Sequence, residues 1–400
     1  MQFDSPILIV EINNFNYIFV AAEYNENQKL KIVKKIITSS EGINNNKFTD
    51  INKAQECIKK NILMLEDKLG HVFKDVIILI DNFDYTCLNL SGFKKLNGSQ
   101  LIKENITYIL NSLKSSVIEH EKDKTILHIF NSKSVLDGQE TENLPIGLFG
   151  NFYNHELSFF LIQNNDLRNI RSLFNKNNLN VKKILIKRFI EGTQLIKQNI
   201  DTETFFFIKI NEDVSQINYF ENSSFKFKEK FNFGSKIILN DISKVCSLDH
   251  KTIKKILSDY YFINNKLVKD DEILDKKYFT NENFRKIRKK LIQDIVYARV
   301  EEILDMIYRF NINLKYLKNN CNNIYISIED SNFKTNFEEI FKTYFFENKS
   351  LKVNFLDNFN EELLILSAVN LSIFGWKKEA IPITQTKNSL ITRIFKSLFG

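Results

Sequence analysis

The sequence has few of the residues that build disulfide frameworks, metal sites and membrane spans. Its four cysteines are Cys57, Cys87, Cys246 and Cys321. They form no C-x-x-C pair, so neither a disulfide framework nor a zinc site is predicted, and we expect reduced, partly buried thiols. No apolar run approaches the roughly 18 residues that span a bilayer. The first residues (MQFDSPILIVEI) carry no basic region and no cleavage site, so they resemble a first strand and not a signal peptide.

Histidine and clustered charge are also scarce. The five histidines are dispersed without nucleophile or metal spacing, and the net charge of +7 is modest for 400 residues. Two basic clusters stand out, residues 182–188 (KKILIKR) and 285–290 (RKIRKK). Neither carries stacking aromatics or a reader motif, so no nucleic-acid partner is expected. We interpret both as solvated helix faces, and an acidic peptide or lipid partner stays open for the second.

The order of apolar segments predicts two related halves. Four hundred residues exceed one compact core, so two or more domains are expected. Strands are predicted at 7–12, 17–24, 30–38 and 76–80, with an amphipathic helix at 51–69 before the last of them. A similar order returns with strands at 204–210, 215–220, 224–233 and 323–327. Two βββαβα, RNase H-like halves predict the α/β, actin-like ATPase fold, with a nucleotide site between them.

Two segments interrupt this plan. Residues 84–162 are predicted to form an inserted α+β subdomain with a hairpin (YTCLNLSG), a helix at 99–115, a strand at 124–131 and a second hairpin ending at 156–162. Residues 249–310 are predicted to be mostly helical, with a long helix from Asn283 to about Arg309.

The last thirteen residues (NSLITRIFKSLFG) form the most informative segment. On a helical wheel their apolar and polar side chains separate onto two faces. Leu390, Ile391, Ile394, Phe395, Leu398 and Phe399 share one half, and Arg393 and Lys396 lie in the other. Such a helix lies in the headgroup layer of an anionic membrane. Residues 377–387 precede it as a predicted tether, and packing of the helix on the protein's own core remains the alternative.

Several motifs resemble the bacterial cell-division protein family FtsA. Asp137, Gly138, Pro145, Gly147, Leu148 and Gly150 match the D-G…P-x-G-L-x-G loop of that family's inserted subdomain. KLIQDIVYARVEEILDMI is similar to the family's long helix, with Arg299 and Glu302 at its arginine and glutamate positions. LILSAVNLSIFG resembles the helix that closes the body, although Asn370 replaces the usual Gly. The terminal helix matches in place and character, so the resemblance covers essentially the whole chain.

The resemblance implies a division into eight regions. The first half comprises residues 1–83 and 163–200 around the insertion at 84–162. The second half comprises a sheet region at 201–248, a helical partner-binding region at 249–310, and a sheet with the closing helix at 311–376. The tether (377–387) and the membrane-binding helix (388–400) follow.

The three nucleotide loops depart from the family pattern. Where D-I-G-T-x-K is usual, the chain has Glu11, Ile12, Asn13, Asn14, Phe15 and Asn16. The second loop contains Lys209, Asn211, Glu212 and Asp213, and the third contains Ile328 and Glu329. Backbone N–H groups cradle phosphates only where side chains leave room, and no glycine remains in these loops. Acidic side chains would also repel a triphosphate. We therefore expect no bound cofactor and no ATPase activity, with weak binding of ATP and Mg²⁺ left open.

The resemblance further implies a peripheral scaffold on the cytoplasmic side of the inner membrane at the division site. Its expected partners are anionic lipid, further copies of itself, other division proteins and the C-terminal tail of the tubulin-like protein FtsZ. Arg285, Lys289, Lys290, Arg299 and Glu302 are the candidate tail-binding residues on the helical region. An ion pair between Arg299 and Glu302 is an equally weighted alternative. The alternative functions are an actin-like type IV pilus assembly protein and a weak ATPase of the actin and sugar-kinase superfamily.

Overall fold

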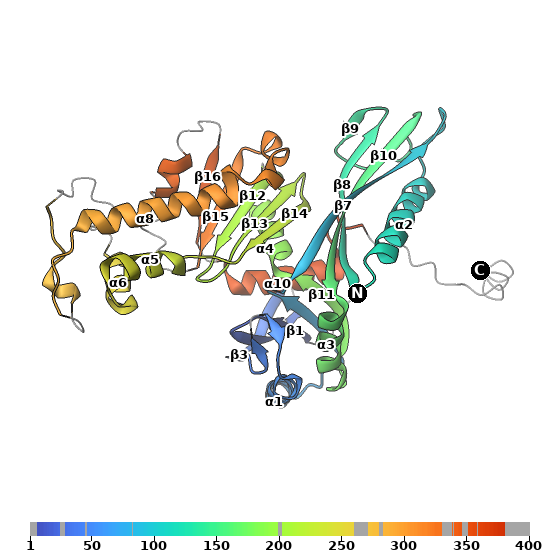
Figure 1. The fold of residues 1–400 in the computed structure, drawn as a ribbon. Helices are drawn as coiled ribbons and strands as arrows, with labels where there is room; N and C mark the ends of the chain where they lie inside the picture. Colours follow the sequence, from blue (N-terminus) through green and yellow to red (C-terminus); the bar gives the residue numbers. More distant parts are fainter. Residues whose placement is uncertain are drawn as a thin grey trace.

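The computed structural model describes residues 6–24, 29–44, 46–81, 83–198, 202–259, 271–279, 283–329, 338, 340–345, 351–357 and 359–380. These residues form a first half, a second half and an inserted subdomain that lies to one side of both (Figure 1). The expected membrane-binding helix and residues 381–387 of the expected tether lie outside the described residues. Within the described residues, no helix combines the length and the apolar character that a membrane crossing needs.

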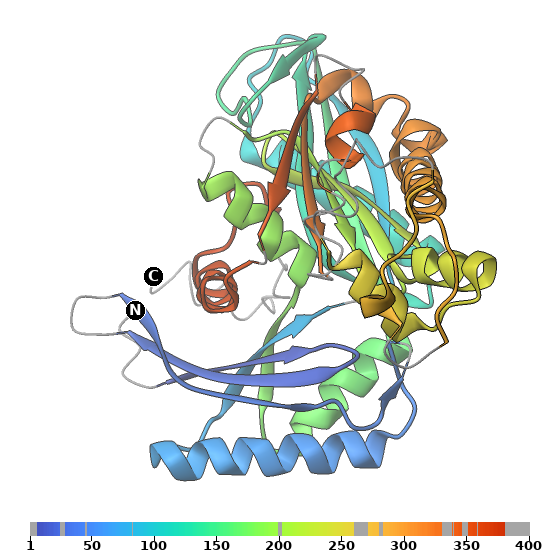
Figure 2. The same ribbon diagram turned by 90° about the vertical axis from the view of Figure 1, so that its left-hand side faces the viewer.

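The first half is built on a five-stranded sheet in the order β11-β6-β1-β2-β3. Its strands are β1 (Ile7–Ile12), β2 (Asn16–Tyr24), β3 (Leu30–Ser39), β6 (Asp75–Ile80) and β11 (Asn180–Ile186). Helices α1 (Ile51–Leu69) and α3 (Asn164–Asn175) cover one face, and α4 (Lys187–Gln198) and α10 (Glu361–Phe374) cover the other (Figure 2). A short β4–β5 hairpin (Ile43–Asn44 and Lys47–Phe48) precedes α1.

Helix α1 forms where the sequence predicts it because both of its ends are capped. The Asp50 carboxylate accepts hydrogen bonds from the backbone N–H groups of Asn52 and Lys53. Gly70 ends the helix in the left-handed conformation, with φ 60°.

The second half repeats the sheet plan in the order β14-β13-β12-β15-β16. Its strands are β12 (Phe205–Ile210), β13 (Ser215–Glu221), β14 (Ser224–Phe231), β15 (Asn323–Ile328) and β16 (Lys352–Leu356). Every residue of β12 (FFFIKI) is buried, as expected for a central strand covered on both faces. Helix α4 lies between the halves, and Gly192 permits its close approach to β13, because a Cβ there would lie 2.0 Å from the ring of Phe220.

The inserted subdomain is a four-stranded sheet in the order β7-β10-β8-β9, with α2 on one face. Its elements are β7 (Tyr85–Lys95), α2 (Lys103–His120), β8 (Lys124–Leu136), β9 (Gln139–Thr141) and β10 (Phe152–Gln163). The hairpin predicted for YTCLNLSG is wrong, because this segment is part of one straight strand that pairs with β10 along its full length. Helix α2 begins at Lys103, whereas the predicted helix begins at residue 99. The Asn105 side chain accepts a hydrogen bond from the Ile102 N–H and fixes this beginning.

The helical region contains α5 (Lys236–Cys246), α6 (His250–Leu257) and α8 (Lys289–Leu304). A π-helical turn (Asp305–Arg309) continues α8, and 3-10 turns lie at Lys276–Tyr278, Ile312–Leu314 and Leu317–Asn320. The prediction that the long helix begins at Asn283 is wrong. Residues 283–288 lack helical structure, and a short backbone ladder, including Leu274 N–H to Ile287 O at 2.9 Å, ties them to the preceding segment.

The chain after α10 also departs from prediction. Residues 377–380 do not begin a free tether, because Glu379 pairs with Phe130 on the outer edge of β8. The segment is therefore part of the folded body as far as Ala380.

Candidate functional site in the cleft between the halves

The two sheets bring charged residues to one place because equivalent strands end there. Glu11 on β1 and Lys209 on β12 occupy the same position in their sheets, opposite Leu79 of β6 and Ser327 of β15. Asp81 directly follows β6, and Glu329 directly follows β15. The carboxyl ends of parallel strands are where ligands bind in open α/β sheets. This is therefore the place where a nucleotide site is expected.

Seven charged side chains fill this place and form what we call the ion cluster. Its members are Glu11, Asp81, Lys187, Arg188, Glu191, Lys209 and Glu329. Lys187 Nζ lies 2.6 Å from Glu11 and 3.6 Å from Asp81. Arg188 pairs with both Asp81 and Glu191. Lys209 Nζ lies 3.4 Å from Glu191 and 2.7 Å from Glu329. The cluster joins the first half, α4 and the second half through contacts between their own side chains.

Glu11, Asp81, Arg188, Glu191 and Lys209 of the ion cluster are buried, whereas the side chain of Glu329 is 44% exposed at its rim. Arg188 is 2% exposed and Glu191 is 1% exposed. Burial opposes ionisation of Asp81, but the charges of Arg188, Lys187 and Lys209 outweigh it and lower the pKa of its carboxyl. Burial likewise opposes the charge of Lys187, but Asp81 and Glu11 raise the pKa of its ammonium. The cations that could meet phosphate are thus already engaged with carboxylates.

The first hairpin turn uses its own amides. Asn13 Oδ1 accepts hydrogen bonds from the backbone N–H groups of Phe15 (2.9 Å) and Asn16 (2.8 Å). Asn13 Nδ2 donates to Glu11 (3.2 Å), and Asn14 Oδ1 accepts from the N–H of Asn46 (3.1 Å). An Asn at this position forms a local side-chain turn that competes for the N–H groups a phosphate would need. Two backbone N–H groups of this turn therefore already have an acceptor in Asn13 Oδ1.

The second hairpin turn is pressed against the start of α5. The carbonyl of Asn211 accepts from Ser235 N–H, and that of Glu212 accepts from Lys236 N–H, each at 2.9 Å. Gly234 permits this contact, since a Cβ there would lie 2.0 Å from the Asn211 carbonyl oxygen. The side chains of the acidic pair turn toward lysines: Glu212 lies 3.4 Å from Lys254, and Asp213 lies 3.0 Å from Lys236. In the third loop Ile328 is buried, and Glu329 reaches back to Lys209.

The candidate tail-binding residues are spread over the helical region and mostly engage neighbours. Arg299 on α8 bonds Asp241 of α5 and also Glu302, at 2.6 Å. Arg285 donates to the Ser247 carbonyl, and Lys289 pairs with Glu272. Lys290 lies 3.6 Å from Asp294 with both side chains well exposed. The contacts of Arg299 give it a structural role in joining α5 to α8. The lipid-binding candidates at 390–399 lie outside the described residues.

Comparison with known proteins bears on the family resemblance and on the fold. No known protein-family profile matches the chain. It is 20% identical over 302 residues to cell division protein FtsA of Buchnera aphidicola subsp. Schizaphis graminum (strain Sg), covering 74% of this chain and 71% of that protein. It is 20% identical over 299 residues to the protein of the same name in Buchnera aphidicola subsp. Acyrthosiphon pisum (strain APS), with the same coverage of each. The chain resembles FtsA.

Among solved structures, the FtsA-like chain is similar to the PilM–PilN type IV pilus biogenesis complex. The TM-score is 0.52 at 9% identity, with 92% of this chain and 98% of that chain covered. The prediction of an actin-like ATPase fold is thereby confirmed. At this identity the likeness shows the fold alone.

Sequence reasoning found three members of the ion cluster and missed four. Glu11, Lys209 and Glu329 were predicted to lie at the nucleotide loops. Lys187 and Arg188 were instead assigned to a solvated helix face, which is wrong because both contact carboxylates inside the cleft. The missed signal was position: K-R-x-x-E directly follows a buried apolar strand (ILI), and Asp81 directly follows another (VIILI).

Proposed function

We propose that this protein is an actin-like cell-division scaffold in which the ion cluster has taken the place of bound nucleotide. It tethers an FtsZ-like partner to the inner face of the cytoplasmic membrane through its terminal helix. The similarity to proteins named FtsA supports the division role. The proposed loss of nucleotide binding rests on one observation: side chains of the protein itself fill the cleft. Its cations pair with carboxylates, and backbone N–H groups of the first turn already have an acceptor in Asn13.

The cost of breaking the buried ion pairs also favours a cleft without nucleotide. A triphosphate entering the cleft would have to separate Lys187, Arg188 or Lys209 from its carboxylate. Breaking a buried ion pair on one side costs about 3–5 kcal/mol, because the remaining charge is left buried and uncompensated. The released carboxylates would then face the phosphates. Mg²⁺ offsets only part of this repulsion, so we infer that the protein works without ATP hydrolysis.

Calorimetric titration with ATP and Mg²⁺ tests the proposal. We expect no saturable binding in the micromolar range and no phosphate release. The variant Glu329→Gln frees Lys209 from one partner, and we expect it to stay nucleotide-free, because Asn13 still occupies the turn amides. Micromolar affinity in the wild type would show that the cleft opens, and the proposed loss of nucleotide binding would be wrong.

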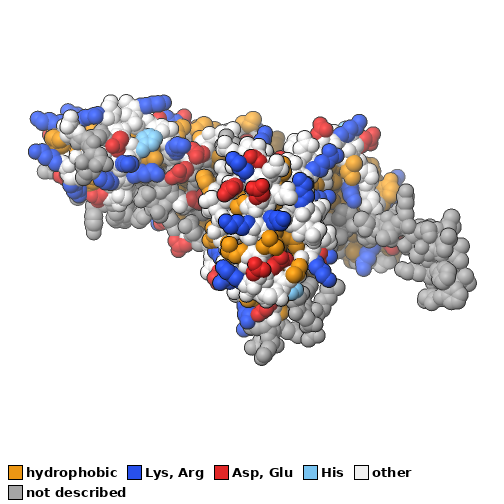
Figure 3. Space-filling view, turned by 90° about the horizontal axis from the view of Figure 1, so that it is seen from below, with side chains coloured by type: hydrophobic (Ala, Val, Ile, Leu, Met, Phe, Trp, Pro, Cys, Tyr) orange, Lys and Arg blue, Asp and Glu red, His pale blue; other side chains and the backbone are white. Residues whose placement is uncertain are grey.

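The helical region supplies the surface best suited to an acidic partner tail. Lys and Arg side chains gather over the part of the molecule that contains α5, α6 and α8, at the left of Figure 3. Exposed apolar side chains accompany them, including Phe284 (41%) and Leu291 (41%). Cations steer an acidic peptide, and exposed apolar residues supply contacts for its hydrophobic anchors. This combination supports the helical region as the docking site for an FtsZ tail.

A further inference from the structure

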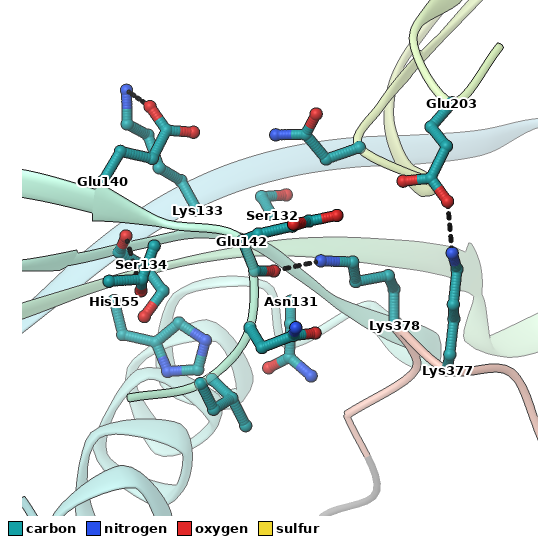
Figure 4. A pocket seen from close by; sticks show the side chains of 14 residues that line it. Asn131, Ser132, Lys133, Ser134, Glu140, Glu142, His155, Glu203, Lys377 and Lys378 are labelled. Carbon is teal, nitrogen blue, oxygen red and sulfur yellow. Dashed lines mark hydrogen bonds and ion pairs between the residues drawn. The ribbon is translucent and has the colours of Figure 1, made fainter. Parts of the chain in front are cut away.

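Residues 376–380, which follow α10, contact all three parts of the molecule. The Trp376 indole N–H donates to the Ser223 carbonyl of the second half at 2.8 Å. Lys377 pairs with Glu203, also of the second half. Lys378 Nζ donates to the Glu142 carbonyl of the inserted subdomain at 2.7 Å (Figure 4). We call residues 376–380 the clasp.

The clasp is joined to the inserted subdomain through backbone pairing. Asn131 N–H donates to the Lys378 carbonyl (2.7 Å), and Ala380 N–H donates to the Ile129 carbonyl (2.8 Å). Phe130 and Glu379 form an antiparallel bridge between these two bonds. Ala380 is 9% exposed within the apolar cluster between α2 and the sheet. The clasp thus adds a short strand to the outer edge of β8, a known way for an extended segment to bind a sheet.

Glu379 connects this added strand to the first half. Its carboxylate lies 3.0 Å from His128 Nδ1 on β8 and 2.9 Å from Lys183 Nζ on β11. The Glu379 side chain is 8% exposed and that of His128 is fully buried. Burial opposes the charge of Glu379, but the hydrogen bond from His128 and the charge of Lys183 outweigh it and lower the pKa of the carboxyl. The carboxylate therefore holds an inserted-subdomain strand against a first-half strand.

A cavity of about 220 Å³ lies beside the clasp, where the inserted subdomain meets the second half. Lys377 and Lys378 line it and reach to opposite walls, one to Glu203 and the other to the loop at Glu142 (Figure 4). His155 also lines the cavity, and neither of its ring nitrogens has a hydrogen-bond partner among the described residues. The junction between these two parts is therefore loosely packed, and the clasp spans it.

We propose that the clasp is a latch that locks the inserted subdomain against both halves. Apart from the chain connections, the second attachment of this subdomain is to β14, where Cys87 Sγ and Asn89 Nδ2 both donate to the Lys226 carbonyl (3.2 and 3.1 Å). Pro382, two residues beyond the clasp, has no N–H to donate to a sheet. This latch does not depend on lipid or FtsZ binding.

The protein contains a native probe for each attachment. Trp376 is the single tryptophan of the chain, so its emission and its quenching by acrylamide report on the clasp. Cys87 reports on the attachment to β14 through its rate of alkylation by a maleimide. Burial raises the pKa of the Cys87 thiol to about 12, so alkylation is slow while the attachment is closed. The buried cysteines Cys57, Cys246 and Cys321 serve as internal references.

Ala380→Pro removes one clasp hydrogen bond, and Ala380→Ser is the matched control that keeps the N–H. In Ala380→Pro we expect red-shifted Trp376 emission and alkylation of Cys87 about threefold to tenfold faster, as for the loss of one hydrogen bond. Glu379→Gln should act in the same direction, and Ala380→Ser should behave like the wild type. Faster alkylation of all four cysteines would signify global unfolding and would overturn the assignment to a latch. So would exposure of Trp376 with an unchanged Cys87 rate.

Deletion of residues 388–400 distinguishes the latch from the proposed membrane-binding helix. The clasp contacts all lie within residues 376–380, so both readouts should be unchanged in this variant even if membrane binding is lost. A shift of Trp376 emission on deletion would mean that the terminal segment itself holds the clasp, and the latch as proposed would be wrong.

Discussion

Asn13 shows how one side chain can engage the backbone N–H groups of a turn. Glycine at such a turn leaves backbone N–H groups open to an anion. Asn13 instead accepts from two of these groups and donates to Glu11. Because backbone N–H groups that already have an acceptor gain less from a phosphate, we expect this turn to bind phosphate weakly.

At the residue scale, Arg188→Ala should lower the free energy of unfolding by about 3–5 kcal/mol, because Asp81 and Glu191 are left buried without their partner. Urea denaturation measures this change. The control is Lys254→Ala, which removes an exposed pair with Glu212 and should cost no more than about 0.5 kcal/mol. A loss below about 1 kcal/mol in Arg188→Ala would mean that water reaches the cluster.

At the element scale, the sequence predicts the central strands and α1 well and the peripheral segments poorly. A short apolar run such as VIILI predicts a buried strand, and the capping residues of α1 lie next to the helix in the sequence. β7 and the clasp have no such local signal, since each is fixed by a partner far along the chain, β10 for one and β8 for the other. The ion cluster is predicted only in part, because the position of Lys187, Arg188 and Glu191 after a buried strand marks them as cleft residues but does not show which carboxylates and cations they meet.

The terminal segment 388–400 should bind anionic vesicles as an amphipathic helix. Phe395→Asp should abolish flotation with such vesicles, because it replaces a side chain worth roughly 1.5–3 kcal/mol when buried with a charge repelled by anionic lipid. Ser389→Ala on the polar face is the matched control and should float like the wild type. Equal flotation of Phe395→Asp and wild type would place the helix on the body of the protein instead.

The helical region should lose affinity for an FtsZ tail peptide when its exposed cations are reversed. Arg285→Glu with Lys290→Glu should weaken binding about tenfold or more, most strongly at low salt, because both changes repel an acidic peptide. Fluorescence anisotropy measures the affinity. Lys59→Glu with Lys60→Glu on α1, in the first half, makes the same change of net charge and should bind the peptide like the wild type. If the double variant of the helical region also binds like the wild type, the docking surface lies elsewhere.

At the scale of the whole molecule, the two halves share an apolar core and the ion cluster, and acid should weaken the fold in two stages because buried titratable groups lie in both the inserted subdomain and the cleft. Burial lowers the pKa of His155 from 6.5 to about 4. A lowered pKa contributes stability that is present above the unfolded value and lost as pH falls through the folded one. Protonation of His155 in the unfolded state should therefore lower the free energy of unfolding by about 2–3 kcal/mol between pH 7 and pH 4.5. The lowered pKa of Asp81 adds a second loss at lower pH.

Denaturation curves at a series of pH values, compared with His155→Leu, test this order. Leucine removes the titrating ring, so the variant should keep its stability from pH 7 to about pH 4.5 and then lose it in the range where Asp81 and the other carboxylates become protonated. Asp81→Asn should show the converse: lower stability at pH 7, and a smaller further loss in strong acid. If the wild type and His155→Leu lose stability in parallel from pH 7 downward, the ring is hydrated in solution. The cavity beside the clasp would then be open to water.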